Sequence, residues 1–166
     1  MLEIARGAAL VAATIATGLI AGLYYGWACS VMPGLARTDD RTMIGAMQGM
    51  NVAIINPWFM ASFGGSMLLT LVAALLHLSG EWRRVLPWIV AALVLYAATL
   101  ISTGTVNVPL NNQLMAAGAA DRIADLAAVR QRFEARWVRW HLARTIAATV
   151  AFGCLTWAMV LHGRVT

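Results

Sequence analysis

Hydrophobic residues of this chain fall into four long runs that are separated by short polar segments. The runs cover residues 7–30, 52–76, 85–106 and 142–161. A helix needs about 20 residues to cross the hydrocarbon of a bilayer, which is about 30 Å thick. The pattern therefore predicts four transmembrane helices in a single domain over residues 1–166.

The polar segment before the last run has a pattern of its own. Apolar side chains recur at helical spacing from Ile123 through Phe133 to Trp137, and the arginines of the segment lie between them. Such a pattern is typical of an amphipathic helix at the membrane surface. The predicted fold is all-α: an integral membrane four-helix bundle with a short amphipathic interfacial helix before the last span.

Prolines mark the predicted ends of helices within this pattern. Proline has no backbone N–H and disfavours helical geometry in the residue before it. Pro33, which is followed by a glycine, should therefore end the first helix, and Pro109 should end the third near Asn107. Pro57 should kink or break the second helix, with Asn56 capping the part that follows.

The composition supports a membrane protein. Hydrophobic residues make up 61% of the chain and charged residues 11%, whereas soluble domains carry about 25% charged residues. The first run is longer than the roughly 7–15 residues of a signal-peptide core, so we interpret it as a structural helix. We expect a multi-pass protein of the bacterial inner membrane.

The net charge of +5 comes from arginine alone, because the chain has no lysine. The arginines flank the apolar runs, so we expect them to contact membrane lipid, and we expect no nucleic-acid partner. The two cysteines, Cys29 and Cys154, lie in apolar runs without a CxxC motif. This pattern argues against a thiol–disulfide oxidoreductase.

Two polar patches border the apolar runs and form the candidate site. One is Asn107–Asn112 and the other is Trp137–Thr145, in which His141 and Arg144 share a helix face. Ionisable groups at the mouth of a span are expensive and usually functional. The predicted catalytic residues are His141, Arg144 and Asn107, and the predicted substrate-binding residues are Asn51, Asn111, Asn112, Trp137, Trp140 and Trp58.

These residue types suit the binding of a flat aromatic anion. His141 titrates near neutrality and can act as a general base. Arg144 can hold an anion or a developing oxyanion, and the tryptophans can stack on an aromatic ring. The spans contain no carboxylate near Arg144, so we expect it to donate to asparagine side chains or to carbonyls freed by Pro109. The three histidines fall on opposite sides of the membrane, so no metal site is predicted.

Several motifs of the chain occur together in a known family. They are Gly22–Tyr25, Ser30–Leu35, Met47–Asn51, Asn56–Phe59, Thr105–Asn112 and the segment from Trp137 through His141 to Thr145. In these motifs, and over nearly its whole length, the chain resembles the anthrone oxygenase-like family of small four-helix membrane proteins, formerly a domain of unknown function. The resemblance implies that O₂ is the co-substrate in oxidising an anthrone or another enolisable aromatic, without a metal or flavin cofactor. The implied partner is a hydrophobic aromatic small molecule.

A second class of function stays open, that of a non-enzymatic small-molecule-binding or scaffolding membrane protein. Such a protein can bind haem through His141, or form a homo-oligomer through a stripe of small residues, Gly18, Gly22 and Gly26. A lined cavity between Asn107, Trp137 and His141 favours an enzyme or a binder. A filled core there, with Arg144 turned to the lipid headgroups, favours a scaffold.

Overall fold

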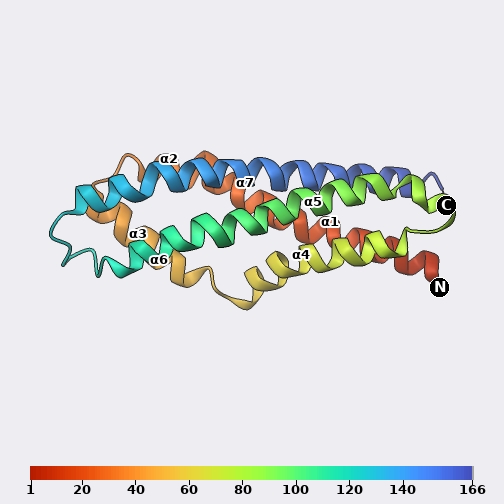
Figure 1. Cartoon of the computed structure of the whole chain (residues 1–166), viewed down its shortest axis with the longest axis horizontal. Coiled ribbons are helices and arrows are strands. Elements are labelled where there is room, and N and C mark those ends of the chain that lie inside the picture. Colours follow the sequence, from red (N-terminus) through yellow and green to blue (C-terminus); the bar gives the residue numbers. More distant parts are fainter. Residues whose placement is uncertain (166) are drawn as a thin grey trace.

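The computed structural model describes residues 1–165, which form helices and no strand. Figure 1 shows an elongated bundle with both termini at one end. Four helical runs are long and apolar enough to cross a membrane, which confirms the predicted all-α membrane bundle and makes the chain a multi-pass membrane protein. The elements are α1 (Leu2–Gly26), a π-helix (Trp27–Val31), α2 (Met32–Leu35), α3 (Asp40–Ala53), α4 (Pro57–Leu76), a 3₁₀ turn (Gly80–Arg84), α5 (Leu86–Ser102), a second π-helix (Thr103–Asn107), α6 (Val108–Ala116) and α7 (Leu126–His162).

Three of the four runs are longer than a bilayer requires. The last run, which is α7, has 37 residues and is therefore about 55 Å long at 1.5 Å per residue. The helix begins after Asp125, whose carboxylate accepts the N–H of Ala128 at 2.9 Å, and it continues without a break to His162. The amphipathic segment forms the first turns of α7 and runs without a break into the last span.

Pro109 does not end its helix, contrary to the sequence prediction, whereas the first helical run ends at Leu35, two residues after Pro33. Each proline follows a π-helical segment, Trp27–Val31 before Pro33 and Thr103–Asn107 before Pro109. At the end of each segment an N–H bonds to the carbonyl five residues back rather than four. The wider turn leaves room for the proline ring, which clashes with the carbonyl four residues back in a regular α-helix. The chain therefore continues as α2 and α6.

The second predicted span is broken where Asn56 and Pro57 predicted a break. Residues 54–56 separate α3 from α4. The side chain of Asn56 serves both helix ends, because its amide donates to the carbonyl of Ala53 at 2.9 Å and its oxygen accepts the N–H of Phe59 at 3.0 Å. The predicted cap is confirmed. Within a membrane such a cap replaces the water that a helix end otherwise needs.

Two hydrophobic cores lie along the bundle, and they recruit different helices. In the part near the termini α4 packs on α1 and α5, whereas in the far part α3 packs on α6 and α7. At the break, α3 therefore takes over from α4 as the helix that packs against the rest of the bundle. The first core includes Leu10, Ile20, Ile89, Tyr96 and Leu155, and the second includes Met43, Ile44, Met47, Leu114 and Phe133.

A polar cluster closes the end of the bundle that carries the termini. His77 donates from Nδ1 to the carbonyl of Ala73 at 2.7 Å, so its Nε2 accepts from Nδ1 of His162, 3.1 Å away. The ring of Trp82 lies 4.5 Å from that of His162, and the guanidinium of Arg6 lies 5.2 Å over Trp82. Because His77 and His162 touch, the ends of α4 and α7 lie at the same height in the membrane.

The glycine stripe of α1 is partly used inside the chain. A Cβ at Gly18 would lie 2.9 Å from the ring of Phe152 on α7, so a larger residue there would have to displace that ring. A Cβ at Gly22 or Gly26 would meet no atom within 4 Å. A homo-oligomer built on the latter two positions stays a prediction.

Candidate functional site

A large cavity lies where α4 gives way to α3. Its volume is about 770 Å³, which falls within the roughly 300–1,000 Å³ of small-molecule sites. Its wall is mostly apolar, and the polar groups on it are few. The lining residues that matter below are Tyr24, Trp27, Asn51, Phe59, Phe63, Thr103, Asn111, Asn112, Trp137, His141 and Arg144.

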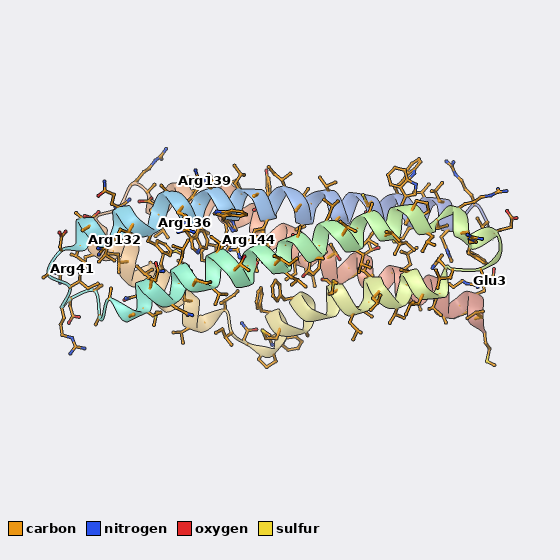
Figure 2. All side chains as sticks on the ribbon, in the orientation of Figure 1. Glu3, Arg41, Arg132, Arg136, Arg139 and Arg144 are labelled. Atoms are coloured by element: carbon orange, nitrogen blue, oxygen red, sulfur yellow. The ribbon has the colours of Figure 1, made fainter. Side chains whose placement is uncertain are left out.

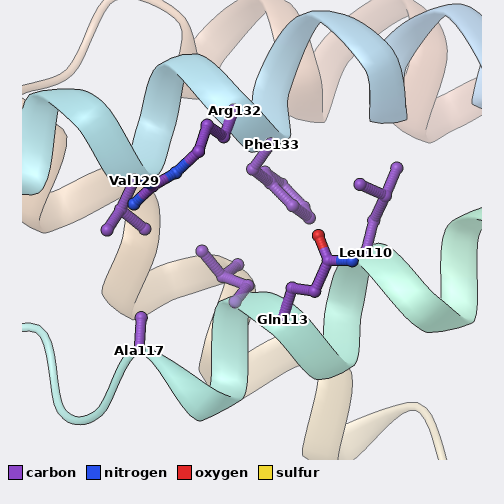
Figure 3. A pocket seen from close by; sticks show the side chains of 7 residues that line it. Leu110, Gln113, Ala117, Val129, Arg132 and Phe133 are labelled. Atoms are coloured by element: carbon purple, nitrogen blue, oxygen red, sulfur yellow. The ribbon is translucent and has the colours of Figure 1, made fainter.

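A second hollow between α6 and α7 is much smaller. Figure 3 shows it with Leu110 and Gln113 of α6 facing Arg132 and Phe133 of α7. Its volume of about 80 Å³ holds water but not an aromatic molecule. The larger cavity is therefore the candidate site.

Arg144 is the charged group of the cavity wall. Figure 2 shows Arg144 closer to the middle of the bundle than three other arginines of α7. Arg132, Arg136 and Arg139 lie nearer the end opposite the termini. The side chain of Arg144 is only 8% exposed, and among residues 1–165 no carboxylate pairs with it. An isolated cation at this depth is costly. The site therefore holds a positive charge that no anion of the described chain balances.

The partners of Arg144 differ from those that the sequence predicted. Nε and Nη2 both donate to Nδ1 of His141, at 3.2 and 3.1 Å, and Nη1 donates to the hydroxyl of Thr103 at 3.2 Å. The guanidinium carbon lies 4.6 Å from the ring centre of Tyr24 and 5.3 Å from that of Trp137. These aromatic faces stabilise a cation. Neither asparagine side chains nor carbonyls near Pro109 bond to it, because the helix continues through that proline and its carbonyls are not freed.

His141 is fixed by hydrogen bonds at both ring nitrogens. Nε2 lies 3.1 Å from the carbonyl oxygen of Tyr24, which can only accept, so Nε2 carries the proton. Nδ1 must then be the acceptor for Arg144, which can only donate. The ring is the neutral Nε2–H tautomer, and its one lone pair points at the guanidinium. The predicted role of general base does not suit this geometry, because a base needs a lone pair that faces the ligand.

An aromatic wall stands beside this pair. The ring of Trp137 stacks on that of His141 with centroids 4.8 Å apart and planes 15° apart, and the ring of Trp27 lies 5.8 Å from Trp137. The indole N–H of Trp137 donates to the side chain of Asn111 at 2.8 Å. Asn107 donates to the carbonyl of Trp137 at 3.3 Å. The two asparagines therefore hold Trp137 in place, and Asn107 lies behind the wall rather than on it.

Two polar groups on the wall have no partner. The hydroxyl of Tyr24 and the amide nitrogen of Asn51 are buried and make no hydrogen bond within the described chain. Tyr24 is only 4% exposed, and its ring lies under the guanidinium of Arg144. Buried polar groups without partners are rare in native proteins. A ligand with oxygen acceptors would satisfy both groups.

The structure brings most of the predicted residues together. Asn51, Asn111, Asn112, Trp137, His141 and Arg144 line the cavity, and Asn107 supports it from behind. Trp58 and Trp140 do not line it, since they are 84% and 38% exposed on the outer surface. The break at residues 54–56 turns Trp58 away from the face of Asn51. Sequence reasoning missed Tyr24, Trp27 and Thr103, although the pairing of Tyr24 and Trp27 at a three-residue spacing already placed them on one helix face.

A family model matches the part of the chain that carries most of the residues lining this site. The model named Anthrone oxygenase matches residues 57–154. The chain belongs to the anthrone oxygenase family. No curated protein and no solved structure matches it. The matched segment carries Thr103, Asn107, Trp137, His141 and Arg144. The other part of the wall, with the two unpartnered donors, comes from α1 and α3, which precede the matched segment.

Proposed function

We propose that the protein binds a polycyclic phenolic aromatic as its oxyanion in the cavity and promotes its oxidation by O₂. The uncompensated charge of Arg144, which lies buried over the ring of Tyr24, supports this proposal most strongly, and the hydroxyl of Tyr24 has no partner. A buried cation with no carboxylate partner favours an anionic ligand. Membership of the anthrone oxygenase family supports an oxygenase-like reaction.

Stabilising an oxyanion is the main task in such a reaction. An anthrone loses the proton of its ring methylene to give a delocalised enolate, whose oxygen carries much of the charge. Arg144 and Tyr24 would hold this oxygen, which lowers the free energy of the enolate relative to the neutral ketone. The apolar wall excludes water, which strengthens both contacts.

The redox balance of the step requires no resident cofactor. The methylene proton passes to water as the ligand enters the cavity. The enolate then gives one electron to O₂, and the resulting radical pair forms a carbon–oxygen bond. The peroxide anion so formed takes a proton back from water, and the hydroperoxide loses water to give the quinone. One anthrone and one O₂ become one anthraquinone and one H₂O. In this scheme His141 takes no proton; it fixes the guanidinium of Arg144, and Trp137 offers a flat face to the rings.

The test is O₂ consumption and quinone formation by the purified protein in liposomes with a phenolic anthrone. The wild-type rate should exceed the spontaneous rate and should survive treatment with a chelator. Arg144→Gln should remove the enhancement, whereas Arg139→Gln, an exposed arginine of the same helix, should keep it. A wild-type rate equal to the spontaneous rate across several anthrones would contradict the proposal. So would full activity of Arg144→Gln.

A further inference from the structure

The cavity is closed on one side and open on the other. Its inner wall is buried, with His141 only 2% exposed and Trp137 only 3% exposed. Its outer rim is exposed and apolar: Val52, Ile55 and Met60 flank the α3–α4 break and are 64%, 74% and 51% exposed, and Val108 and Met115 of α6 are 42% and 41% exposed. The opening therefore lies between α6 and the break.

The height of this opening follows from the contact between His77 and His162. These residues touch at the ends of α4 and α7, so both helices can be measured from the same level. Pro57 lies about 30 Å up α4 from there, and Arg144 lies about 27 Å up α7, at 1.5 Å per residue. The hydrocarbon is about 30 Å thick. With the polar cluster around His77 and His162 at one boundary of the hydrocarbon, the opening and Arg144 lie together near the opposite boundary, between lipid chains and headgroups.

The broken backbone at this boundary fits an opening to lipid. Non-helical backbone at membrane depth is tolerated only where protein buries it or where it lines a cavity. Ile54 and Ile55 line the cavity, and Asn56 satisfies the carbonyls of Ala53 and Ile54 with its own amide. The break thus leaves a gap in the helical wall without leaving those carbonyls unsatisfied.

We propose that the cavity takes its ligand, the aromatic oxyanion proposed above, sideways from the bilayer through the opening between α6 and the α3–α4 break. The apolar rim admits the rings, and Arg144 at the inner end is complementary to the charge. A phenol dissolved in a membrane lies at this same depth, with its rings among the chains and its oxygen near the headgroups. The aromatic class rests on the proposed function; the direction of access rests on the rim and its height.

The experiment uses photoreactive probes with the wild-type protein in phosphatidylcholine liposomes. The first probe is a phosphatidylcholine in which a photoreactive naphthol ends one short acyl chain, so that the naphthol lies at the depth of the opening. The second is the same naphthol on a polyethylene glycol chain, which stays in water. The third is the acyl-chain probe with the photoreactive group but without the naphthol. Labelled peptides are mapped by mass spectrometry, and a free photoreactive naphthol serves as the positive control.

The chain-linked naphthol should label peptides that contain Met60 and Trp137, and the water-bound naphthol should not. The probe without naphthol should label these peptides several-fold less. Arg144→Gln should reduce the labelling, whereas Arg139→Gln should not. Met115→Trp, which narrows the opening, should slow labelling by the chain-linked probe; Val94→Trp, at a 62% exposed position of α5 away from the cavity, should not.

Each other outcome counts against a specific statement. Labelling by the water-bound probe alone would overturn lateral access, as would equal labelling with and without the naphthol, because the cavity would then simply hold a lipid chain. If free naphthol labels the cavity and the chain-linked form does not, lateral access is wrong while the ligand class stands. If free naphthol does not label the cavity either, the proposed function fails as well.

Discussion

Replacing His141 by leucine tests whether this side chain serves mainly to hold Arg144. In the variant, two of the three guanidinium donors that now bond to protein lose their acceptor, and only the bond to Thr103 remains. A hydrogen bond to a charged group is worth about 1.5–3 kcal/mol, and the carbonyl of Tyr24 loses its bond to the imidazole, worth about 0.5–1 kcal/mol, but keeps the N–H of Trp27. Leucine has a similar volume, so the packing change is small. The free energy of unfolding should fall by about 2–4 kcal/mol.

The measurement is reversible unfolding in mixed micelles by titration with dodecyl sulfate, followed by circular dichroism. His141→Gln, which keeps one acceptor and one donor, should recover much of the loss. Trp140→Leu, at an exposed neighbouring position, should change the free energy of unfolding by no more than about 0.5 kcal/mol. Anthrone oxidation gives a second readout. If His141 acts as a base, His141→Gln should lose activity, because glutamine cannot take a proton. If His141 only positions Arg144, His141→Gln should keep most of the activity. A leucine variant as stable as the wild type, or a glutamine variant as unstable as leucine, would refute the reasoning.

Two further predictions concern other parts of the fold. Asn56→Ala removes the cap of α4 and the donor to the end of α3. The free energy of unfolding, measured as above, should fall by about 1–2 kcal/mol. Asn56→Asp should restore the part of this loss that comes from the cap of α4, because its carboxylate can still accept the N–H of Phe59. An alanine variant of wild-type stability would show that the break needs no cap. Burial, together with the charges of His162 and Arg6, holds the pKa of His77 below its usual value. Stability should therefore be complete above about pH 6.5 and should fall as the pH drops through the lowered pKa, because the unfolded state binds the proton first. His77→Gln should flatten this dependence, and a slope that persists in the variant would place its origin elsewhere.

The number of spans and the break could be predicted because their causes are local. A membrane requires about 20 apolar residues for each crossing, and this requirement is visible in any window of the sequence. Asn56 and Pro57 carry their own cap and their own missing donor. Grouping Asn51, Asn111, His141 and Arg144 followed from the same reasoning, since all four lie at the same end of their spans.

Other features depended on contacts that no window of the sequence contains. Pro109 signals a helix end locally, but packing of α6 against α3 and α7 favours a continued helix, and the π segment absorbs the proline. Tyr24 was missed because its partner His141 is 117 positions away. Trp58 was misplaced because grouping it with Asn51 on one helix face ignored the turn that the break at residues 54–56 introduces between them. In each case tertiary packing decided what the local pattern left open.

The irregularities of this fold gather around one cavity, and physical cost explains why this matters. The two π segments contribute Trp27 and Thr103 to the wall, and the α3–α4 break contributes Ile54 and Ile55. Each departure from the α-helix weakens backbone hydrogen bonding in a solvent that cannot replace it. Arg144 adds a buried charge without a counterion. Departures of this kind are expected at functional sites, where other interactions compensate for them. Selection for stability alone would not place the two π segments, the α3–α4 break and the buried Arg144 around the same cavity. A ligand that supplies the missing anion and fills the opening explains why they gather there.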